Sequence, residues 1–319
     1  MNFFKYLFKK VLLVLLGLFL ITSLSYVVIF PFINNASLIN QPIMNQYFKF
    51  LGSIFHSFGQ VYHSSSFSNA SEYFFYYYKW SLLFEGLTFF FSIIIGFLIG
   101  IFLAYKNKKL SEVIVNFIIF LLAAIPTFIL APLILILAEA IDLPVNFILP
   151  SNANFGFTLL SSLLPVALLS ISAISYYAII IKNATLKILK QEYITVLKTS
   201  GQSSTSIFFK GVFKNLIAAT INQVLSMIII IISFSLILER IFQIPGQSLI
   251  LTTAFENGEI NVLMCLIFYK ALLLFTLGLI FEVTSDILQV DNGLNLYYTI
   301  NFGNVFKKHA LLEKGVQNE

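Results

Sequence analysis

The chain of 319 residues is 59% hydrophobic, 16% aromatic and only 10% charged, with a formal net charge of +5. A composition this apolar excludes an ordinary soluble domain and predicts an all-α membrane protein. The positive charge does not indicate nucleic-acid binding, because the lysines cluster in separate loops and form no continuous basic stretch.

Six apolar segments are long enough to cross a membrane as helices. About twenty residues, at a rise of about 1.5 Å each, cross a hydrocarbon core of roughly 30 Å. The first segment lies within residues 1–30, and we expect it to be retained, because its apolar run is longer than a signal-peptide core and no small-x-small cleavage site follows it. The other predicted helices are Ser81–Tyr105, Glu112–Ala140, Phe157–Ile181, Leu216–Leu238 and Val262–Phe281.

The distribution of cationic residues predicts the orientation of these helices. Fifteen of the nineteen lysines and arginines fall in segments that would share one side, three fall on the other side, and Lys270 lies within a helix. Cytoplasmic loops are enriched in lysine and arginine, so we expect both termini in the cytoplasm. The chain then divides into the first helix (1–30), an extracellular loop (31–79), a five-helix core (80–288) and a cytoplasmic tail (289–319).

Two features within the predicted helices suggest particular packing. Gly96 and Gly100 lie four residues apart in the second helix, a spacing that permits close approach of a neighbouring helix. Pro126 and Pro132 each remove a backbone donor from the third helix, so we expect a kink there. A bent helix either lines a translocation path or only packs against its neighbours, and the sequence leaves both open.

The stretch 182–215 is the one long polar passage between two predicted membrane helices. It contains six lysines, which places it in the cytoplasm. The pattern predicts a short amphipathic helix, a break at Gly201 where positive φ is tolerated, and a second helix capped by the hydroxyls that follow. Such a loop either docks a soluble partner or lies on the lipid headgroups. The apolar stripe of the first helix comprises Leu186, Leu189, Tyr193, Val196 and Leu197.

Two charged positions near the end of the chain are candidates for a translocation path. Lys270 lies in an apolar helix, where a charge is costly and should face a cavity or a partner. It has four possible environments: Glu239, the pair Glu256 and Glu259, a substrate carboxylate, or the membrane surface reached by snorkelling. Glu239 adjoins Arg240 at a predicted helix end, and the alternative for this pair is a surface ion pair worth about 0–1 kcal/mol.

Several kinds of chemistry have no support in the sequence. No phosphate-binding Gly-x-x-x-x-Gly-Lys-Ser/Thr motif occurs, so any ATP must be hydrolysed by another polypeptide. The three histidines are scattered without metal-ligand spacing, and Cys265 is the single cysteine. We therefore expect no catalytic site, no metal and no cofactor.

From Leu164 onward the chain resembles the permease subunits of the oligopeptide, dipeptide and nickel class of ABC importers, most closely the oligopeptide permease B branch. Two shorter stretches, Ile125-Pro126-Thr127-Phe128 and the segment from Glu239 to Pro245-Gly246, also match motifs of this family. The matching residues around the polar loop are Leu164-Pro165, Lys182, Glu192-Tyr193-Ile194, Gly201, Lys210, Lys214 and Asn215.

This resemblance implies a type I importer bundle in which the loop is a coupling helix that docks on a cytoplasmic ATPase. The implied partners are a second homologous permease, two ATP-binding subunits, an extracellular substrate-binding protein and membrane lipid. Glu239, Pro245 and Gly246, with Pro126 and Lys270, would lie near the translocation path. The family's two small alanines are replaced here by Leu197 and Thr199, which predicts a bulkier docking surface.

The alternative function is a secondary transporter for a small solute. That class is expected to show internal repeats and ionisable groups at the membrane midplane. We find no repeat, and Lys270 is the clear ionisable candidate, because Glu85 and Glu139 are expected near helix ends.

Overall fold

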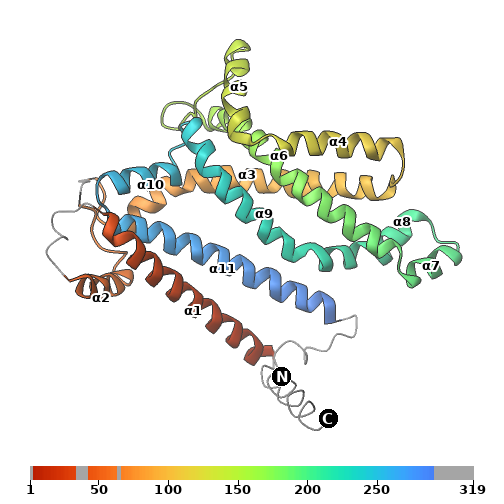
Figure 1. Ribbon diagram of the computed structural model, residues 1–319, viewed down its shortest axis with the longest axis horizontal. Helices are drawn as coiled ribbons and strands as arrows, with labels where there is room; N and C mark the ends of the chain where they lie inside the picture. The colour runs from red at the N-terminus through yellow and green to blue at the C-terminus, as the bar shows by residue number, and fades with distance from the viewer. Residues whose placement is uncertain (1–2, 34–41, 63–65, 291–319) are drawn as a thin grey trace, which may run out of the picture.

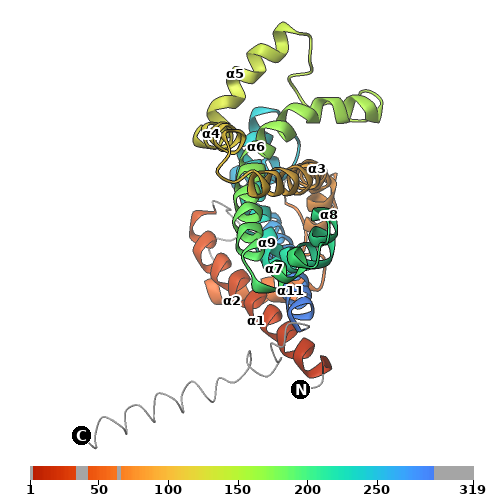
Figure 2. The ribbon, with the colours of Figure 1, turned by 90° about the vertical axis from the view of Figure 1, so that its right-hand side faces the viewer.

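The computed structural model describes residues 3–33, 42–62 and 66–290, and these residues form helices joined by turns and loops (Figures 1 and 2). The predicted cytoplasmic tail therefore lies almost entirely outside the described residues. The elements are α1 (Phe3–Ile29), η1 (Phe30–Phe32), α2 (Ile43–Ile54), α3 (Ala70–Tyr105), α4 (Leu110–Ala124), α5 (Thr127–Ala140), α6 (Phe155–Leu189), α7 (Glu192–Thr199), α8 (Ser204–Ile207), η2 (Phe208–Val212), α9 (Phe213–Ile241), α10 (Gln247–Glu256) and α11 (Ile260–Val290).

Five helices within the described residues are long and apolar enough to cross a membrane, and the bent pair α4 and α5 supplies a sixth span if it is counted as one. This confirms the all-helical membrane class. Lys10 of α1 forms an ion pair with Glu282 of α11, so the start of the first span lies beside the end of the last, as an even number of crossings requires. The sidedness of the termini stays a prediction from the lysine distribution.

The third predicted helix is interrupted, which goes further than the expected kink. Helices α4 and α5 meet at an angle of 93°. Ile125 adopts an extended conformation, and Pro126 follows it as the N-cap of α5. The residue before a proline is disfavoured in the α region, and proline lacks the N–H that would continue a helix. The α5 helix projects from the bundle in both views (Figures 1 and 2).

The second span is longer than predicted, because α3 begins at Ala70 rather than Ser81. The side chain of Asn69 accepts a hydrogen bond from the backbone N–H of Glu72, and the carboxylate of Glu72 accepts from Ser68. These contacts cap the helix N-terminus. The predicted loop 31–79 thus includes the short helix α2 and the first ten residues of α3.

The last span is also longer than predicted, because α11 extends to Val290 rather than ending at Phe281. Its added turns include Glu282 and Asp286, which bond to Lys10 and Tyr6 of α1. These two residues therefore lie within a helix that packs beside α1 (Figure 1).

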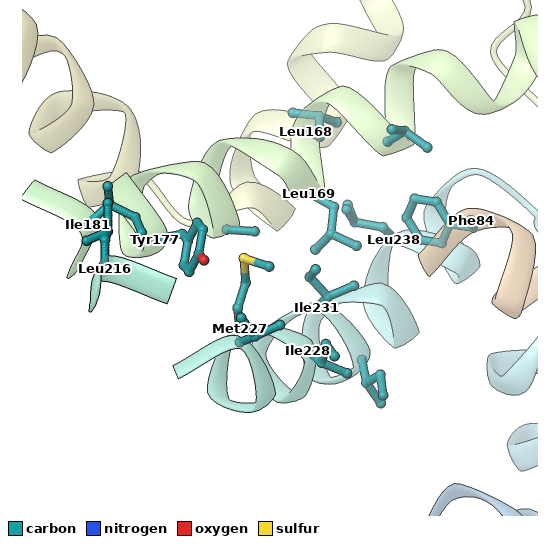
Figure 3. Close-up of a cluster of buried hydrophobic side chains, with 14 of the residues drawn as sticks. Phe84, Leu168, Leu169, Tyr177, Ile181, Leu216, Met227, Ile228, Ile231 and Leu238 are labelled. Carbon is teal, nitrogen blue, oxygen red and sulfur yellow. The ribbon is translucent and has the colours of Figure 1, made fainter. Parts of the chain in front are cut away.

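The main hydrophobic core lies where α3, α6 and α9 pack together, and Figure 3 shows the part of it between α6 and α9. Tyr177 and Ile181 of α6 and Met227 of α9 are each at most 3% exposed. Gly96 and Gly100 of α3 face α6, because a Cβ at Gly100 would lie 2.5 Å from Ile181 Cβ. The close helix approach predicted from the Gly-x-x-x-Gly spacing is confirmed.

We expect Gly100→Ala to destabilise the bundle by about 1–3 kcal/mol, because the added methyl group also meets the carbonyl oxygen of Ala178 at 2.7 Å. The measurement is the melting temperature of the purified protein in mild detergent. Gly86→Ala is the matched control, since Gly86 lies on the same helix with nothing within 4 Å of the added carbon. Equal melting temperatures for the two variants would contradict this packing.

Candidate coupling loop and intramembrane polar cluster

The polar loop forms one end of the bundle, and α7 and α8 lie there at the end opposite α2 and α10 (Figure 1). The break after α7 has the predicted geometry, because Gly201 adopts φ of +75° and its N–H donates to the carbonyl oxygen of Lys198. Ser203 then accepts a hydrogen bond from the N–H of Ser206 and caps α8. Both the helix break and the hydroxyl cap are confirmed.

The apolar stripe predicted for one short helix is divided between two helices, which corrects that expectation. Leu186 and Leu189 belong to the last turns of α6. Gln191 is extended, with φ of −72° and ψ of 146°, and α7 begins after it. The three- and four-residue spacing continues across this break, so the pattern alone did not reveal it.

Ile194 and Leu197 attach α7 to the start of the fifth span. Ile194 is fully buried, and a Cβ on Gly211 would lie 2.8 Å from its Cδ1 and 2.9 Å from Leu197 Cδ1. Leu197 therefore points toward the chain, which corrects the expectation that its bulk enlarges the docking surface. A Cβ at position 211 would force both side-chain ends to shift.

Tyr193 and Asn215 add hydrogen bonds to the same contact. The hydroxyl of Tyr193 donates to the carbonyl oxygen of Gly211 at 3.1 Å, and Asn215 Nδ2 donates to that hydroxyl at 2.8 Å. Gly211 lies in η2, a π-helical turn that runs directly into α9. Such turns are frequent at functional sites. Neither this turn nor the role of Gly211 is predicted from the sequence, where the one signal is a glycine between two phenylalanine-containing turns.

The outer face of α7 is exposed and has an apolar centre. Val196 is 65% exposed and Tyr193 is 40% exposed, and Glu192 and Thr199 are exposed beside them. The predicted residues Lys210 and Lys214 are exposed on the following turns. All seven residues predicted for the loop therefore gather at one end of the bundle.

Lys182 joins this end of the bundle to α4. Its Nζ lies 2.5 Å from a carboxylate oxygen of Glu112, which also accepts from the backbone N–H of Lys108 and from Asn116 Nδ2. The cationic residue that precedes the loop in the sequence thus fastens α6 to α4.

We expect Tyr193→Phe to loosen α7, because it removes two hydrogen bonds of about 0.5–1.5 kcal/mol each. Amide hydrogen exchange over residues 192–199 should speed up severalfold while exchange in the middle of α9 stays the same. Tyr76→Phe, at an exposed site near the opposite end, is the control. Unchanged exchange in α7 would contradict the anchoring role of this hydroxyl.

A second group of polar residues lies inside the bundle, where α9 turns into α10. Glu239 is only 1% exposed, so it forms no surface pair with Arg240. One carboxylate oxygen of Glu239 accepts from the N–H of Ser248 at 2.8 Å, at the N-terminus of α10. Negative charge is favoured at this end of a helix. A Cβ at Gly246 would lie 2.2 Å from Ser81 Oγ, so glycine alone fits in the turn after Pro245.

Gln247 is the centre of this group, the intramembrane polar cluster. Its Nε2 donates to Glu85 at 3.0 Å and to the hydroxyl of Ser235 at 2.6 Å, and its Oε1 accepts from Lys270. The hydroxyl of Ser235 also donates to Glu85 at 2.8 Å. Four helices thus meet in one hydrogen-bonded network, because these residues come from α3, α9, α10 and α11.

The network shows which of the protein's own groups surround Lys270. Its ammonium group points to Gln247 and interacts electrostatically with Glu85 and Glu239, and it does not snorkel outward. Glu85 is 6% exposed and lies inside α3, which corrects our placement of it near a helix end. The sequence does contain a sign of this burial, because Glu85 is the only acidic residue between Glu72 and the end of α3.

Pro126 is not part of the cluster. It lies at the break between α4 and α5, where its side chain is exposed. The other four residues predicted for a translocation path, Glu239, Pro245, Gly246 and Lys270, lie at the turn from α9 to α10 or bond to it. Among the residues that the structure describes, no three histidine, cysteine, aspartate or glutamate side chains gather as a metal site would require.

Curated relatives of the chain include oligopeptide transport system permease proteins OppB from three bacteria. The protein of Haemophilus influenzae is 27% identical over 255 residues, covering 78% of this chain and 79% of the relative. The protein of Escherichia coli K12 is 26% identical over 228 residues, covering 70% of each. That of Mycoplasma pneumoniae is 25% identical over 214 residues, and the match covers only about half of it (54%).

The family model for the binding-protein-dependent transport system inner membrane component matches residues 96–290, which is more than half of the chain. The matched region runs from the glycines that pack α3 on α6, through α7, to the end of α11. These findings confirm the resemblance to ABC importer permeases and place the chain in the cell membrane as a subunit that is not itself an enzyme. The chain belongs to the family of binding-protein-dependent transport system inner membrane components.

Proposed function

We propose that this chain is the permease subunit of an ATP-driven oligopeptide importer, and that α7 is the helix that docks on the ATPase. In this proposal the chain and a second homologous permease together form the translocation path. Two cytoplasmic ATP-binding subunits supply the energy, and an extracellular binding protein delivers the peptide. The oligopeptide substrate is inferred from the printed names of the distant relatives.

The observation that supports this function best is the construction of α7. The helix presents Val196 outward at the end of the bundle while Ile194 and Tyr193 fasten it to Gly211. A displacement of α7 by a partner is therefore passed to η2 and from there into α9. In an importer, such a transfer couples closure of the ATPases to a switch of the bundle between inward- and outward-facing states.

The test is purification of the tagged full-length chain from its native membrane in mild detergent, followed by an assay for ATP hydrolysis and partner subunits. We expect an ATPase to co-purify, and we expect it to be lost when residues 192–201 are replaced by a glycine-serine segment of the same length. Replacement of the exposed loop residues 151 and 152, between α5 and α6, is the control, because it leaves α7 intact.

Buried ionisable groups such as those of the intramembrane polar cluster also mark ion pathways in secondary transporters, but the family of the chain contradicts that alternative. Uptake into proteoliposomes separates the two functions. Solute uptake by the chain alone, driven by an ion gradient without ATP, would replace the importer proposal. Uptake that requires ATP and the co-purified ATPase would support it.

A further inference from the structure

The exposed face of α9 carries polar residues inside the membrane span. Helix α9 lies between α6 and α11 (Figure 1). On its remaining face, side chains recur at three- and four-residue spacing and so form one stripe along the helix. In the half nearest to α7, this stripe consists of Ala219, Asn222, Gln223 and Ser226, which we call the α9 polar quartet. Ala219 and the two amides are exposed, and Ser226 is half-buried.

The quartet lies within the hydrocarbon core of the membrane. Gln223 is nine residues after Lys214 and seventeen before Arg240, which corresponds to about 14 Å and about 26 Å along the helix. The headgroup region on each side of a bilayer is only about 5–7 Å thick. A polar side chain that faced lipid at this depth would lose its hydrogen bonds to water at a high cost. The quartet therefore faces water or another polypeptide.

The other half of the stripe has a different chemistry. It consists of Ile230, Ser233, Phe234 and Ile237, and its exposed large side chains, Phe234 and Ile237, are apolar. The hydroxyl of Ser233 donates to the carbonyl oxygen of Ile229, so its hydrogen bond is made within the helix. Membrane helices associate by close van der Waals packing, and this half suits contact with a helix of a second subunit. The polar quartet suits water instead.

The two amides of the quartet keep hydrogen-bonding groups available. Gln223 Oε1 accepts from the hydroxyl of Tyr176 of α6 at 3.2 Å. Asn222 Nδ2 donates to Ser285 Oγ of α11 at 3.3 Å, and Asn222 also borders a cavity of about 600 Å³ between α1, α9 and α11. Within the part of the chain that the structure describes, neither Gln223 Nε2 nor Asn222 Oδ1 has a partner. One donor and one acceptor remain, which is the pair that a peptide group requires.

We propose that the α9 polar quartet lines the half of the translocation path nearest to α7 and hydrogen-bonds to the backbone of the passing peptide. This inference rests on the proposed importer function, which supplies the peptide. The quartet contains no ionisable residue, so it contacts groups that all peptides share and does not select for side-chain charge. It extends about 10 Å along the helix, the length of about three residues of an extended chain.

The first experiment measures which positions of α9 are exposed to water in the full-length protein with its co-purified subunits in proteoliposomes. Each variant carries one new cysteine and is treated with a charged methanethiosulfonate, and modification is followed by mass spectrometry. Cys265, the single native cysteine, is fully buried, so the unsubstituted chain is the blank. We expect Ala219→Cys and Gln223→Cys to react about tenfold faster than Phe234→Cys, because a thiol reacts as the thiolate, which forms in water and not in an apolar contact.

Leu98→Cys is the matched control for exposure to lipid. Leu98 is 61% exposed on α3 and lies eight residues before Lys106, so its depth is close to that of Gln223. We expect it to stay unmodified. Equal rates at Leu98→Cys and Gln223→Cys would overturn the proposal. Slow modification of both Ala219→Cys and Gln223→Cys would also overturn it, because a helix of another subunit would then cover the quartet.

The second experiment tests the contact with the peptide backbone. Gln223→Leu should lower ATP-driven peptide uptake about fivefold, because one hydrogen bond is worth about 0.5–1.5 kcal/mol and 1.4 kcal/mol is tenfold. The loss should be the same for a lysine-rich and a glutamate-rich peptide. Tyr176→Phe is the control, since it removes the same bond within the chain and leaves Gln223 Nε2 in place. No loss in Gln223→Leu, or a loss for only one of the two peptides, would overturn the backbone contact.

The failure of this inference differs from the failure of the proposed function. Rapid modification at Ala219→Cys and Gln223→Cys in a complex without ATP-driven peptide uptake would overturn the importer function, and with it the peptide as the ligand. ATP-driven peptide uptake by a complex in which both cysteines stay unmodified would overturn the role of the quartet alone.

Discussion

Val196→Asp should reduce peptide-stimulated ATP hydrolysis and peptide uptake by tenfold or more, with the chain still inserted and folded. Val196 is 65% exposed on α7, so the change removes little packing within the chain. If a partner covers this face, the new carboxylate must lose water without gaining a counter-ion, and each 1.4 kcal/mol of that cost weakens binding tenfold. The measurements are uptake into proteoliposomes and ATPase activity of the purified complex.

Gly201→Arg tests the same surface from the other side of the helix break. Gly201 has φ of +75° and nothing lies within 4 Å of an added Cβ, so arginine fits in space but strains the backbone and projects from the loop. We expect uncoupled transport and normal insertion.

Asn107→Asp is the matched control for Val196→Asp, because it adds the same charge at an exposed turn at this end of the bundle. Wild-type coupling in both Val196→Asp and Gly201→Arg would exclude α7 as the docking element.

The helices were predictable from the sequence because each span is a continuous apolar run, which the bilayer requires. Their ends were less predictable, since helix ends depend on local polar contacts. The start of α3 at Ala70 is set by the cap that Asn69 and Glu72 form. The aromatic residues that follow are typical of the membrane interface, so the apolar run alone placed the helix start too late. The helix break at Gly201 was predictable, because glycine is the residue type that best tolerates positive φ. This inference depends on the residue itself and not on contacts with other parts of the chain.

The intramembrane polar cluster was only partly predictable, because it joins residues that are distant along the chain. Glu85 and Ser235 are 150 positions apart, so no local pattern shows that they meet. Lys270 was recognised because a charge in an apolar helix needs a partner. Its hydrogen-bond acceptor, Gln247, was not foreseen, and of the two acids near it only Glu239 had been considered. The π-helical turn at η2 likewise depends on how Gly211 meets Ile194, a contact between two elements.

Lys270→Met should destabilise the folded bundle by on the order of 3 kcal/mol, because it removes the cation that interacts with the buried carboxylates of Glu85 and Glu239. Glu85→Gln should also destabilise it, since the lysine then loses a buried counter-charge. The double variant Glu85→Gln/Lys270→Met should lose less than the sum of the two single changes. Such non-additivity is the expected signature of residues in one network.

The measurement is the melting temperature in mild detergent, followed by the fluorescence of Trp80, the single tryptophan. Lys79→Met and Glu256→Gln make the same chemical changes at exposed sites on α3 and α10 and should leave the melting temperature nearly unchanged. Additive effects of the two cluster substitutions would mean that Lys270 and Glu85 act independently. Coupled effects would instead identify the network around Gln247 as the junction that fixes α10 between the second, fifth and sixth spans, so that α10 moves only when those helices move.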